Sequence, residues 1–264
     1  MKENMKVRIL NGTALSLNVI IVILTFYSIV GMTTGSIAGN MTAGVRAFRY
    51  FTNLSNILVA VFSTMLIPFN INGLISGKYE VPKWLGVCKF VGTTAVTITF
   101  VTVVFFLGPT MGWTMMFDGP CLYLHALIPI LAIISLVFVE VDNPVSFKLS
   151  IFGLAPSVIY SIIYLFAVVI TKVWPDFYGF TFGGKMWAIP LSMIMMYSAA
   201  FALSSALWAL QNLFHKLYFL PKGERFVKKS KKTNNANGNE TTNVDALDSH
   251  NKTDNGVTDN TDLT

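Results

Sequence analysis

Thr52, Ser55 and Asn56 stand three and four residues apart at the start of a long apolar stretch. In an α-helix this spacing places the three side chains on one face. Polar side chains that enter a bilayer cost free energy, and they usually mark function or helix packing. His125 lies about one turn inside another apolar stretch. Because ionisable groups are rare within spans, its imidazole is the second candidate functional group.

Thr52 and His125 together offer nucleophilic acyl transfer. A threonine hydroxyl is a weak nucleophile and needs a base, and a neutral imidazole can take its proton and return it to the leaving group. Both residues lie near predicted helix N-termini, where the helix dipole favours a developing oxyanion or a fatty carboxylate. We therefore predict Thr52 and His125 as the catalytic pair, with Asn53, Ser55 and Asn56 as substrate-binding or oxyanion-supporting residues.

Other interpretations of these residues stay open. Cys121 precedes His125 by four residues, on the same helical face, and is an alternative nucleophile. Ser55 and Asn56 are also of the type that hydrogen-bonds a neighbouring membrane helix. Cys121, His125 and Asp118 have no recognised metal-ligand spacing, and the chain has no phosphate-binding or dinucleotide-binding motif. We expect no metal and no cofactor.

Membrane-spanning helices must position these groups. Of the 264 residues, 53% are hydrophobic and 12% are charged, whereas soluble domains carry about 25% charged residues. A helix needs about 20 mostly apolar residues to cross the hydrocarbon core, where water cannot satisfy backbone groups. We predict an all-α, polytopic integral membrane protein with six transmembrane helices. The six stretches are about Ile9–Gly31, Phe51–Ile71, Trp84–Leu107, Cys121–Val139, Ser150–Thr171 and Met186–Phe214.

Six spans place both termini on one side of the membrane. Fourteen Lys and Arg residues then lie on that side and four on the other. The positive-inside rule predicts a multi-pass protein of the cell membrane with cytoplasmic N- and C-termini, and Thr52 and His125 in the outer leaflet. Lys89 counts among the basic residues at the inner end of the third span, and Glu140 ends the fourth. We therefore expect no charged relay inside the bundle and no coupling to ions.

The chain divides into three parts. Residues 1–221 form the six-helix transmembrane domain, in which the outer segment Trp174–Phe180 has the aromatic composition of a membrane interface. Residues 222–232 are a basic juxtamembrane segment that anchors the topology or contacts anionic lipid. Its basic residues are Lys222, Arg225, Lys228, Lys229, Lys231 and Lys232. Residues 233–264 have few large apolar residues and are predicted to be a disordered cytoplasmic tail.

Two segments resemble known membrane proteins. RYFTNLSNIL (49–58) resembles the aromatic-Thr-x-x-Ser-Asn-hydrophobic stretch of bacterial Pr6Pr-type six-span membrane proteins, and HALIP (125–129) resembles their H-x-x-x-P fourth span. The spacing and the layout of about residues 9–220 are also similar to the androgen-induced membrane hydrolases of animals. This resemblance implies a catalytic threonine at Thr52, a catalytic histidine at His125, and fatty acid esters of hydroxy fatty acids as substrates.

The residues and the resemblance favour a membrane hydrolase of lipid esters that acts at the outer leaflet. Its expected partners are membrane lipids and a lipid or lipophilic small-molecule substrate. The net charge of +6 comes from residues that flank the spans, so we expect no nucleic-acid binding. The alternative is a non-catalytic membrane protein that binds or transports a small lipophilic ligand. A third possibility is a structural or partner-binding membrane protein.

Overall fold

The structure, a computed structural model, describes residues 2–35, 44–141 and 144–219. The chain divides into two compact units, Met1–Leu220 and Pro221–Thr264, and all described residues belong to the first. The predicted basic segment 222–232 and the predicted tail 233–264 lie outside the described residues.

Six helical segments are long and apolar enough to cross a membrane, and the described residues form no strand. The predicted all-α, six-span architecture is therefore confirmed. The segments are Met5–Thr34, Phe51–Ser76, Lys83–Met111, Pro120–Val139, Phe147–Ile170 and Ala188–Leu217. Several are longer than the apolar stretches in the sequence, because the helices continue into the polar residues that flank them.

Single helices form the first, second and sixth spans: α1 (Lys2–Thr34), α2 (Phe51–Ser76) and α10 (Ala188–Phe219). The 3-10 turn η1 (Gly44–Arg49) precedes α2. Wide π-helical turns interrupt the other three spans. The third consists of α3 (Lys83–Thr102), η2 (Val103–Leu107) and α4 (Gly108–Met111), and α5 (Trp113–Phe117) follows it. The fourth consists of α6 (Pro120–Leu122), η3 (Tyr123–Leu127), α7 (Ile128–Ile134) and η4 (Ser135–Val139). The fifth consists of α8 (Phe147–Ser150), the 3-10 turn η5 (Ile151–Leu154), α9 (Ala155–Leu165) and η6 (Phe166–Ile170).

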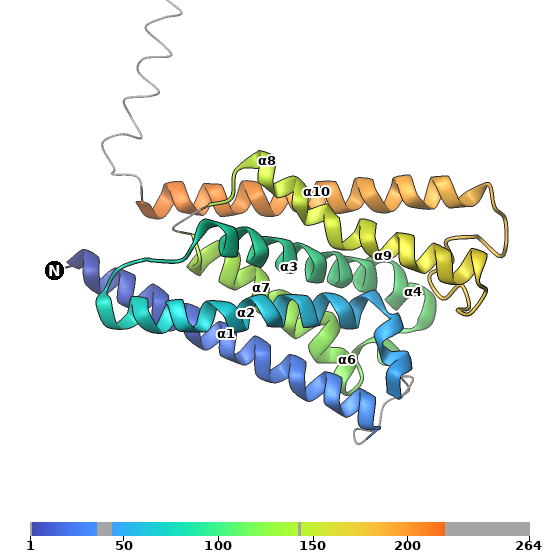
Figure 1. The fold of residues 1–264 in the computed structure, drawn as a ribbon, viewed down its shortest axis with the longest axis horizontal. Coiled ribbons are helices and arrows are strands. Elements are labelled where there is room, and N and C mark those ends of the chain that lie inside the picture. Colours follow the sequence, from blue (N-terminus) through green and yellow to red (C-terminus); the bar gives the residue numbers. More distant parts are fainter. Residues whose placement is uncertain (1, 36–43, 142–143, 220–264) are drawn as a thin grey trace, which may run out of the picture. The chain divides into compact units, whose positions relative to one another are not determined.

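The third span is the centre of the bundle. In its most apolar window 61% of the residues are buried, against 17% in the sixth span. Figure 1 shows α3 running between α2 and α10, and it also contacts α7 and η5. Its threonines Thr94 and Thr97 are buried and donate their hydroxyl hydrogen bonds to the carbonyls of Phe90 and Thr93. The hydroxyls of these threonines therefore bond carbonyls of their own helix, as is common in membrane helices, and the side chains act as packing residues.

Gly92 brings α3 close to α2. A Cβ atom at this position would lie 3.0 Å from the Cα atom of Val59, closer than nine in ten real Cβ contacts. Small residues at such crossings allow two membrane helices to approach backbone to backbone. About two turns further along α3, the Thr99 hydroxyl lies 3.0 Å from the Ser55 hydroxyl of α2. The close approach at Gly92 therefore allows α2 and α3 to share a hydrogen bond.

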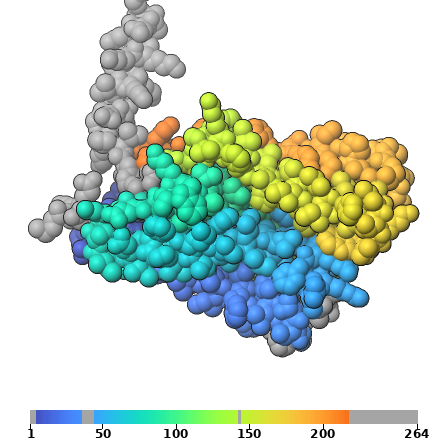
Figure 2. Space-filling model, viewed as in Figure 1, coloured from blue at the N-terminus to red at the C-terminus, as the bar shows by residue number. Residues whose placement is uncertain are grey.

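Large apolar side chains cover the outside of the bundle. Phe26, Phe105 and Trp187 are 70%, 77% and 70% exposed. Such a surface is unfavourable in water and suits contact with lipid chains. In Figure 2 the beginning of α2 meets α9 directly, in agreement with the ring contact between Phe51 and Tyr160 at 5.2 Å. The two helices therefore close this face at the end where α2 begins.

Candidate active site

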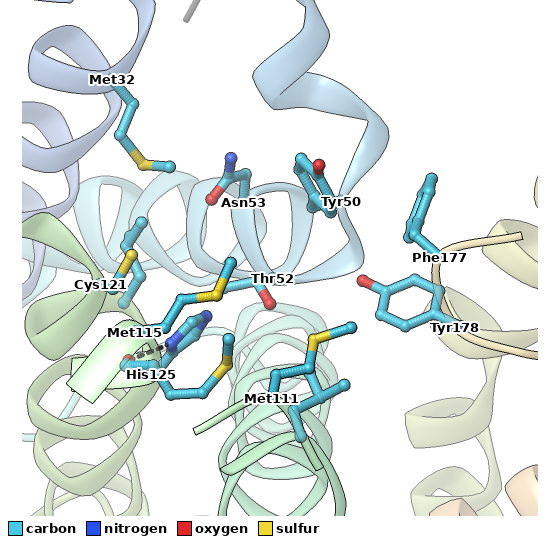
Figure 3. A pocket seen from close by; sticks show the side chains of 13 residues that line it. Met32, Tyr50, Thr52, Asn53, Met111, Met115, Cys121, His125, Phe177 and Tyr178 are labelled. Atoms are coloured by element: carbon cyan, nitrogen blue, oxygen red, sulfur yellow. Dashed lines mark hydrogen bonds between the residues drawn. The ribbon is translucent and has the colours of Figure 1, made fainter. Parts of the chain in front are cut away.

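A cavity of about 120 Å³ lies at the end of the bundle where α1 ends and α2 begins. We call it the Thr52 cavity. Thr52 and His125 both line it, although they come from different spans. Figure 3 shows both side chains pointing into this space. The other lining residues are Met32, Tyr50, Asn53, Leu107, Met111, Met115, Met116, Cys121, Leu124, Phe177 and Tyr178.

The His125 ring is fixed by one hydrogen bond. Its side chain is 3% exposed, and its Nδ1 atom lies 2.6 Å from the Met116 carbonyl oxygen of α5. A carbonyl only accepts hydrogen bonds, so Nδ1 must carry the hydrogen. In the neutral ring Nε2 is then the unprotonated nitrogen, with its lone pair available. The backbone of α5 thus selects the tautomer in which Nε2 is a base.

Pro129 explains how Asn56 joins the second span to the fourth. In the π-helical turn η3, the N–H of Ile128 bonds to the carbonyl of Tyr123, five residues earlier. The same pattern would bring the next N–H to the Leu124 carbonyl, but Pro129 has none. The Asn56 amide nitrogen bonds this carbonyl instead, at 3.0 Å. Asn56 therefore supplies the hydrogen-bond donor that the carbonyl of Leu124, the residue before His125, lacks within its own helix.

Asn56 also fixes the beginning of α2, because its amide nitrogen donates a second hydrogen bond to the Thr52 carbonyl at 2.7 Å. The Ser55 hydroxyl lies 2.9 Å from the same carbonyl oxygen and 3.0 Å from the Thr99 hydroxyl. Neither Ser55 nor Asn56 is among the residues that line the cavity. In the structure both side chains hold helices together, and Asn53 alone of the three predicted supporting residues lines the cavity.

Thr52 lies in the first turn of α2 and is 8% exposed. The first amides of a helix have no helical carbonyl to bind. Here the Phe51 N–H bonds the Tyr178 hydroxyl at 3.1 Å, and the Asn53 and Leu54 N–H groups bond the Tyr50 carbonyl. These bonds leave the N–H of Thr52 itself available. The positive end of the α2 dipole and this N–H both favour negative charge beside the Thr52 hydroxyl.

Tyr178 is a site residue that the sequence did not indicate. It belongs to the segment Trp174–Phe180, whose aromatic composition we interpreted as that of a membrane interface. Its hydroxyl accepts the Phe51 N–H and, in Figure 3, points into the cavity on the side of Thr52. Burial raises the pKa of Tyr178 to about 12, so the phenol stays neutral and can donate a hydrogen bond. Phe51 and Tyr178 are 127 residues apart in the chain, so no local sequence pattern indicates that they pair.

Asn53 offers a further donor at the cavity. Its side chain is 2% exposed, and its amide nitrogen donates to the Ala47 carbonyl at 2.7 Å. An amide nitrogen carries two hydrogens, so one remains for another acceptor. Cys121, the alternative nucleophile, also lines the cavity as a free thiol and is buried. Both interpretations of the nucleophile therefore remain compatible with the geometry.

Asp176 organises the loop that carries Tyr178. Its carboxylate accepts hydrogen bonds from the Tyr164 hydroxyl at 2.8 Å, the Phe180 N–H at 2.9 Å, and the Thr181 N–H and hydroxyl at 2.8 and 2.6 Å. Burial tends to raise the pKa of Asp176, but these hydrogen bonds outweigh burial and hold its pKa below the ordinary value. The carboxylate therefore stays charged at neutral pH and keeps the hydrogen bonds that hold the loop.

Asp176→Asn is expected to speed hydrogen exchange at the Phe180 and Thr181 amides by about tenfold or more, because hydrogen bonds to a charged group are the stronger ones. In the wild type the same amides lose protection in acid. The pKa of Asp176 is lower in the folded chain than in the unfolded chain, where it is about 3.9. The charged carboxylate therefore stabilises the loop above the unfolded pKa, and this stabilisation is lost as the pH falls through the folded pKa. Hydrogen-exchange mass spectrometry checks this, with Asp118→Asn as the control. Equal exchange in both variants would refute the role of Asp176.

Lys89 differs from our expectation. We counted it among the basic residues at the end of the third span, but it is 1% exposed and lies inside the bundle. Its ammonium bonds the Asn18 side-chain oxygen at 2.5 Å and the Ser63 hydroxyl at 2.7 Å. Asn18 in turn donates to Glu140 at 2.7 Å. The expectation of a bundle without interior charge was therefore wrong, since neighbouring helices supply polar partners that the sequence does not reveal.

No family model, curated protein sequence or solved structure matches this chain. The function of this chain must therefore be inferred from the cavity itself. Among the described residues, no group of three or more His, Cys, Asp and Glu side chains is arranged to hold a metal ion. The chemistry that the cavity offers is that of a hydroxyl, a thiol, an imidazole and several hydrogen-bond donors.

Proposed function

We propose that this integral membrane protein hydrolyses lipid esters, with Thr52 as the nucleophile and His125 as the base. One observation carries the proposal: Thr52 and His125 line the same cavity, and the Met116 carbonyl holds the His125 ring with Nε2 unprotonated. This combination of a hydroxyl, a neutral imidazole and a group that orients the imidazole is the arrangement that activates a weak nucleophile.

In the first half of the reaction, Nε2 of His125 takes the proton of the Thr52 hydroxyl as the oxygen attacks the ester carbonyl. The carbonyl oxygen becomes an oxyanion, which the Tyr178 hydroxyl, the Asn53 amide and the Thr52 N–H can stabilise. The tetrahedral intermediate then breaks its bond to the alcohol oxygen. His125 returns the proton to this oxygen, so the alcohol leaves and the acyl group remains on Thr52.

In the second half, water attacks the acyl-threonine ester. His125 takes a proton from this water and returns it to the Thr52 oxygen when the acyl bond breaks. The products are a carboxylic acid, the alcohol and the original enzyme, so atoms and protons balance without a cofactor.

The lining of the cavity supports an acyl chain as part of the substrate. Four methionines, Met32, Met111, Met115 and Met116, contribute to it. Methionine side chains are apolar and flexible, so they adapt to chains of different shape. Two of them, Met115 and Met116, belong to the short helix α5. Tyr50, Phe177 and Tyr178 also line the cavity, and their rings suit the boundary between lipid chains and headgroups.

A covalent probe for serine and threonine hydrolases tests the proposal on the full chain in isolated membranes. We expect it to label the wild type and to lose its signal in Thr52→Ala and in His125→Ala, at equal expression. Thr64→Ala is the matched control, because Thr64 lies exposed on the same helix and bonds the Ala60 carbonyl. Its labelling should equal that of the wild type. Peptide mass spectrometry should locate the adduct on Thr52.

Two outcomes would contradict the assignment. An adduct on Cys121, together with loss of labelling in Cys121→Ala, would make the thiol the nucleophile. The absence of any label in the wild type would favour the alternative, a non-catalytic protein that binds a lipophilic ligand. The methionine-rich lining supports that second candidate equally well. Binding of a photoreactive fatty acid that survives in Thr52→Ala and His125→Ala would distinguish ligand binding from catalysis.

A further inference from the structure

The wall of the Thr52 cavity is thin where α4 meets α5. Met111 and Met115 line the cavity (Figure 3) and are 48% and 39% exposed, whereas its other lining residues are buried or half-buried. Met111 ends α4, and Met115 lies in α5. Each of these side chains therefore borders the cavity on one side and the outer surface of the bundle on the other. At this place a single side chain separates the cavity from the surroundings of the protein.

The cavity is too small for a whole lipid ester. Its volume is about 120 Å³, whereas pockets that enclose small organic ligands measure about 300–1,000 Å³. The ester group and the first carbons of a chain fit this space, but the rest of a fatty acyl chain must extend through the wall. The wall at Met111 and Met115 borders an apolar outer surface, which suits lipid chains. An acyl chain can therefore take this route if α4 and α5 separate there.

Two glycines in the left-handed region of backbone conformation flank α5. Gly112 precedes the helix and has a φ of 100°, and Gly119 follows it after one residue and has a φ of 51°. Glycine adopts positive φ about as readily as negative φ, so the chain can rotate at both positions. A Cβ atom on Gly112 would meet no atom within 4 Å. This position therefore uses the backbone freedom of glycine, as a hinge does, and not its small size.

One ring seats α5 against α4. A Cβ atom on Gly108 of α4 would lie 2.7 Å from two ring atoms of Trp113, a distance that real Cβ atoms essentially never show. The Trp113 ring thus lies directly on the glycine, and it also stacks on Phe117 of its own helix at 5.9 Å. On the inner side, Met116 packs with the apolar residues of η2. Trp113 is 49% exposed, so this seat lies at the surface of the bundle.

The same helix holds the base in place. The Met116 carbonyl of α5 accepts the Nδ1–H of His125 at 2.6 Å, and this contact leaves Nε2 unprotonated. A movement of α5 away from η3 takes this carbonyl away from the ring. The tautomer of His125 is then no longer fixed, so the base is set only while α5 is seated.

We propose that α5 is a lid that turns about its two flanking glycines and lets an acyl chain pass between Met111 and Met115. The ester group then lies beside Thr52, and the rest of the chain reaches the outer surface. When the lid closes over the chain, the Met116 carbonyl returns to His125 and sets the base. Only this last step rests on the proposed hydrolysis, because the lid and the tautomer exist without a reaction.

Gly108→Ala tests the seat of the lid. Gly108 has a helical φ of −59°, so alanine fits the backbone and its methyl group displaces the Trp113 ring. We expect nitrogen-15 NMR of the histidine-labelled chain in lipid nanodiscs, above the ordinary histidine pKa of about 6.5, to show His125 protonated on Nδ1. In Gly108→Ala the tautomer protonated on Nε2 should appear beside it. The matched control is Gly12→Ala, because a Cβ atom on this helical glycine would meet its nearest neighbour at an ordinary 3.5 Å.

Binding of radiolabelled palmitic acid and of butyric acid to the same variants provides the second readout. Gly108→Ala should bind palmitic acid about fivefold more tightly than the wild type, since the chain no longer has to displace the lid. Butyric acid fits the closed cavity and should bind both proteins equally. With an ester substrate, the kcat of Gly108→Ala should fall while its KM does not rise. A general packing defect would instead weaken binding as well.

Trp113→Ala removes the seat from the other side, should Gly108→Ala fail to fold. It should give the same mixed tautomers, Trp113→Phe should restore the wild-type spectrum, and Trp187→Ala, at a 70% exposed tryptophan outside the cavity, should change nothing. Wild-type spectra and wild-type palmitic acid affinity in both Gly108→Ala and Trp113→Ala would overturn the lid, as would a wild type that binds no palmitic acid. A wild type that binds palmitic acid but hydrolyses no ester would overturn the proposed hydrolysis and leave the lid supported.

Discussion

Replacing His125 by asparagine is expected to lower the hydrolysis of a chromogenic fatty-acid ester by about 10²–10⁴-fold, the usual contribution of general acid–base catalysis. Asparagine can still donate a hydrogen bond to the Met116 carbonyl, but it has no lone-pair nitrogen in place of Nε2. The variant therefore removes the base but keeps the hydrogen bond between position 125 and the Met116 carbonyl of α5. Initial rates of the purified chain in detergent, with kcat and KM determined separately, provide the measurement.

The effect should appear in kcat, with little change in KM, because the lost interaction acts on the transition state. His215→Asn is the control: this histidine contacts the Val141 carbonyl and does not line the Thr52 cavity. A His125→Asn enzyme with wild-type kcat would show that His125 is not the base. Equal loss in His125→Asn and His215→Asn would instead indicate general damage to the bundle.

Replacing Lys89 by methionine is expected to lower the free energy of unfolding by about 3–5 kcal/mol, as when one charge is removed from a buried network, here the one in which Asn18 bridges Lys89 and Glu140. Methionine has a similar length but no charge, so Asn18 and Ser63 lose their common donor and Glu140 keeps an uncompensated charge. Denaturant unfolding in detergent micelles, followed by tryptophan fluorescence, measures the change.

The double variant Lys89→Met, Glu140→Gln should recover much of this loss, because both charges are then absent from the interior. Lys83→Met is the control, since Lys83 is exposed at the first residue of α3 and should shift stability by no more than about 0.5 kcal/mol. A Lys89→Met protein as stable as the wild type would mean that the ammonium contributes nothing to the bundle. A double variant less stable than Lys89→Met would exclude a charge-pair explanation.

The sequence predicted the spans correctly because crossing a bilayer is a local requirement. About 20 apolar residues in a row must form a helix, whatever the rest of the chain does. The same reasoning placed Thr52 and His125 at one end of the bundle, since α2 begins at Phe51 and the fourth span begins at Pro120. The membrane orientation, the resemblance to membrane hydrolases and the catalytic roles stay predictions.

The sequence could not show which groups the polar side chains at this site contact. The sequence left Asn56 either as an oxyanion donor or as a bond to a neighbouring helix; in the structure its amide bonds the carbonyl that Pro129 leaves without an N–H. Tyr178 appeared to be an interface aromatic, but its hydroxyl caps α2 and points into the cavity. Both contacts depend on the rotation of one helix against another, which an apolar composition leaves undetermined.

Length and hydrophobicity alone determined that this chain has six helices able to span a membrane and that a threonine and a histidine lie at the same end of the bundle. Only the tertiary structure decided that these two side chains share one cavity, that a backbone carbonyl selects the tautomer of His125, and that Lys89 lies inside the bundle beside Glu140. The physical reason is that burial in lipid is a property of each helix, whereas hydrogen-bond partners belong to pairs of helices and follow from how those helices cross.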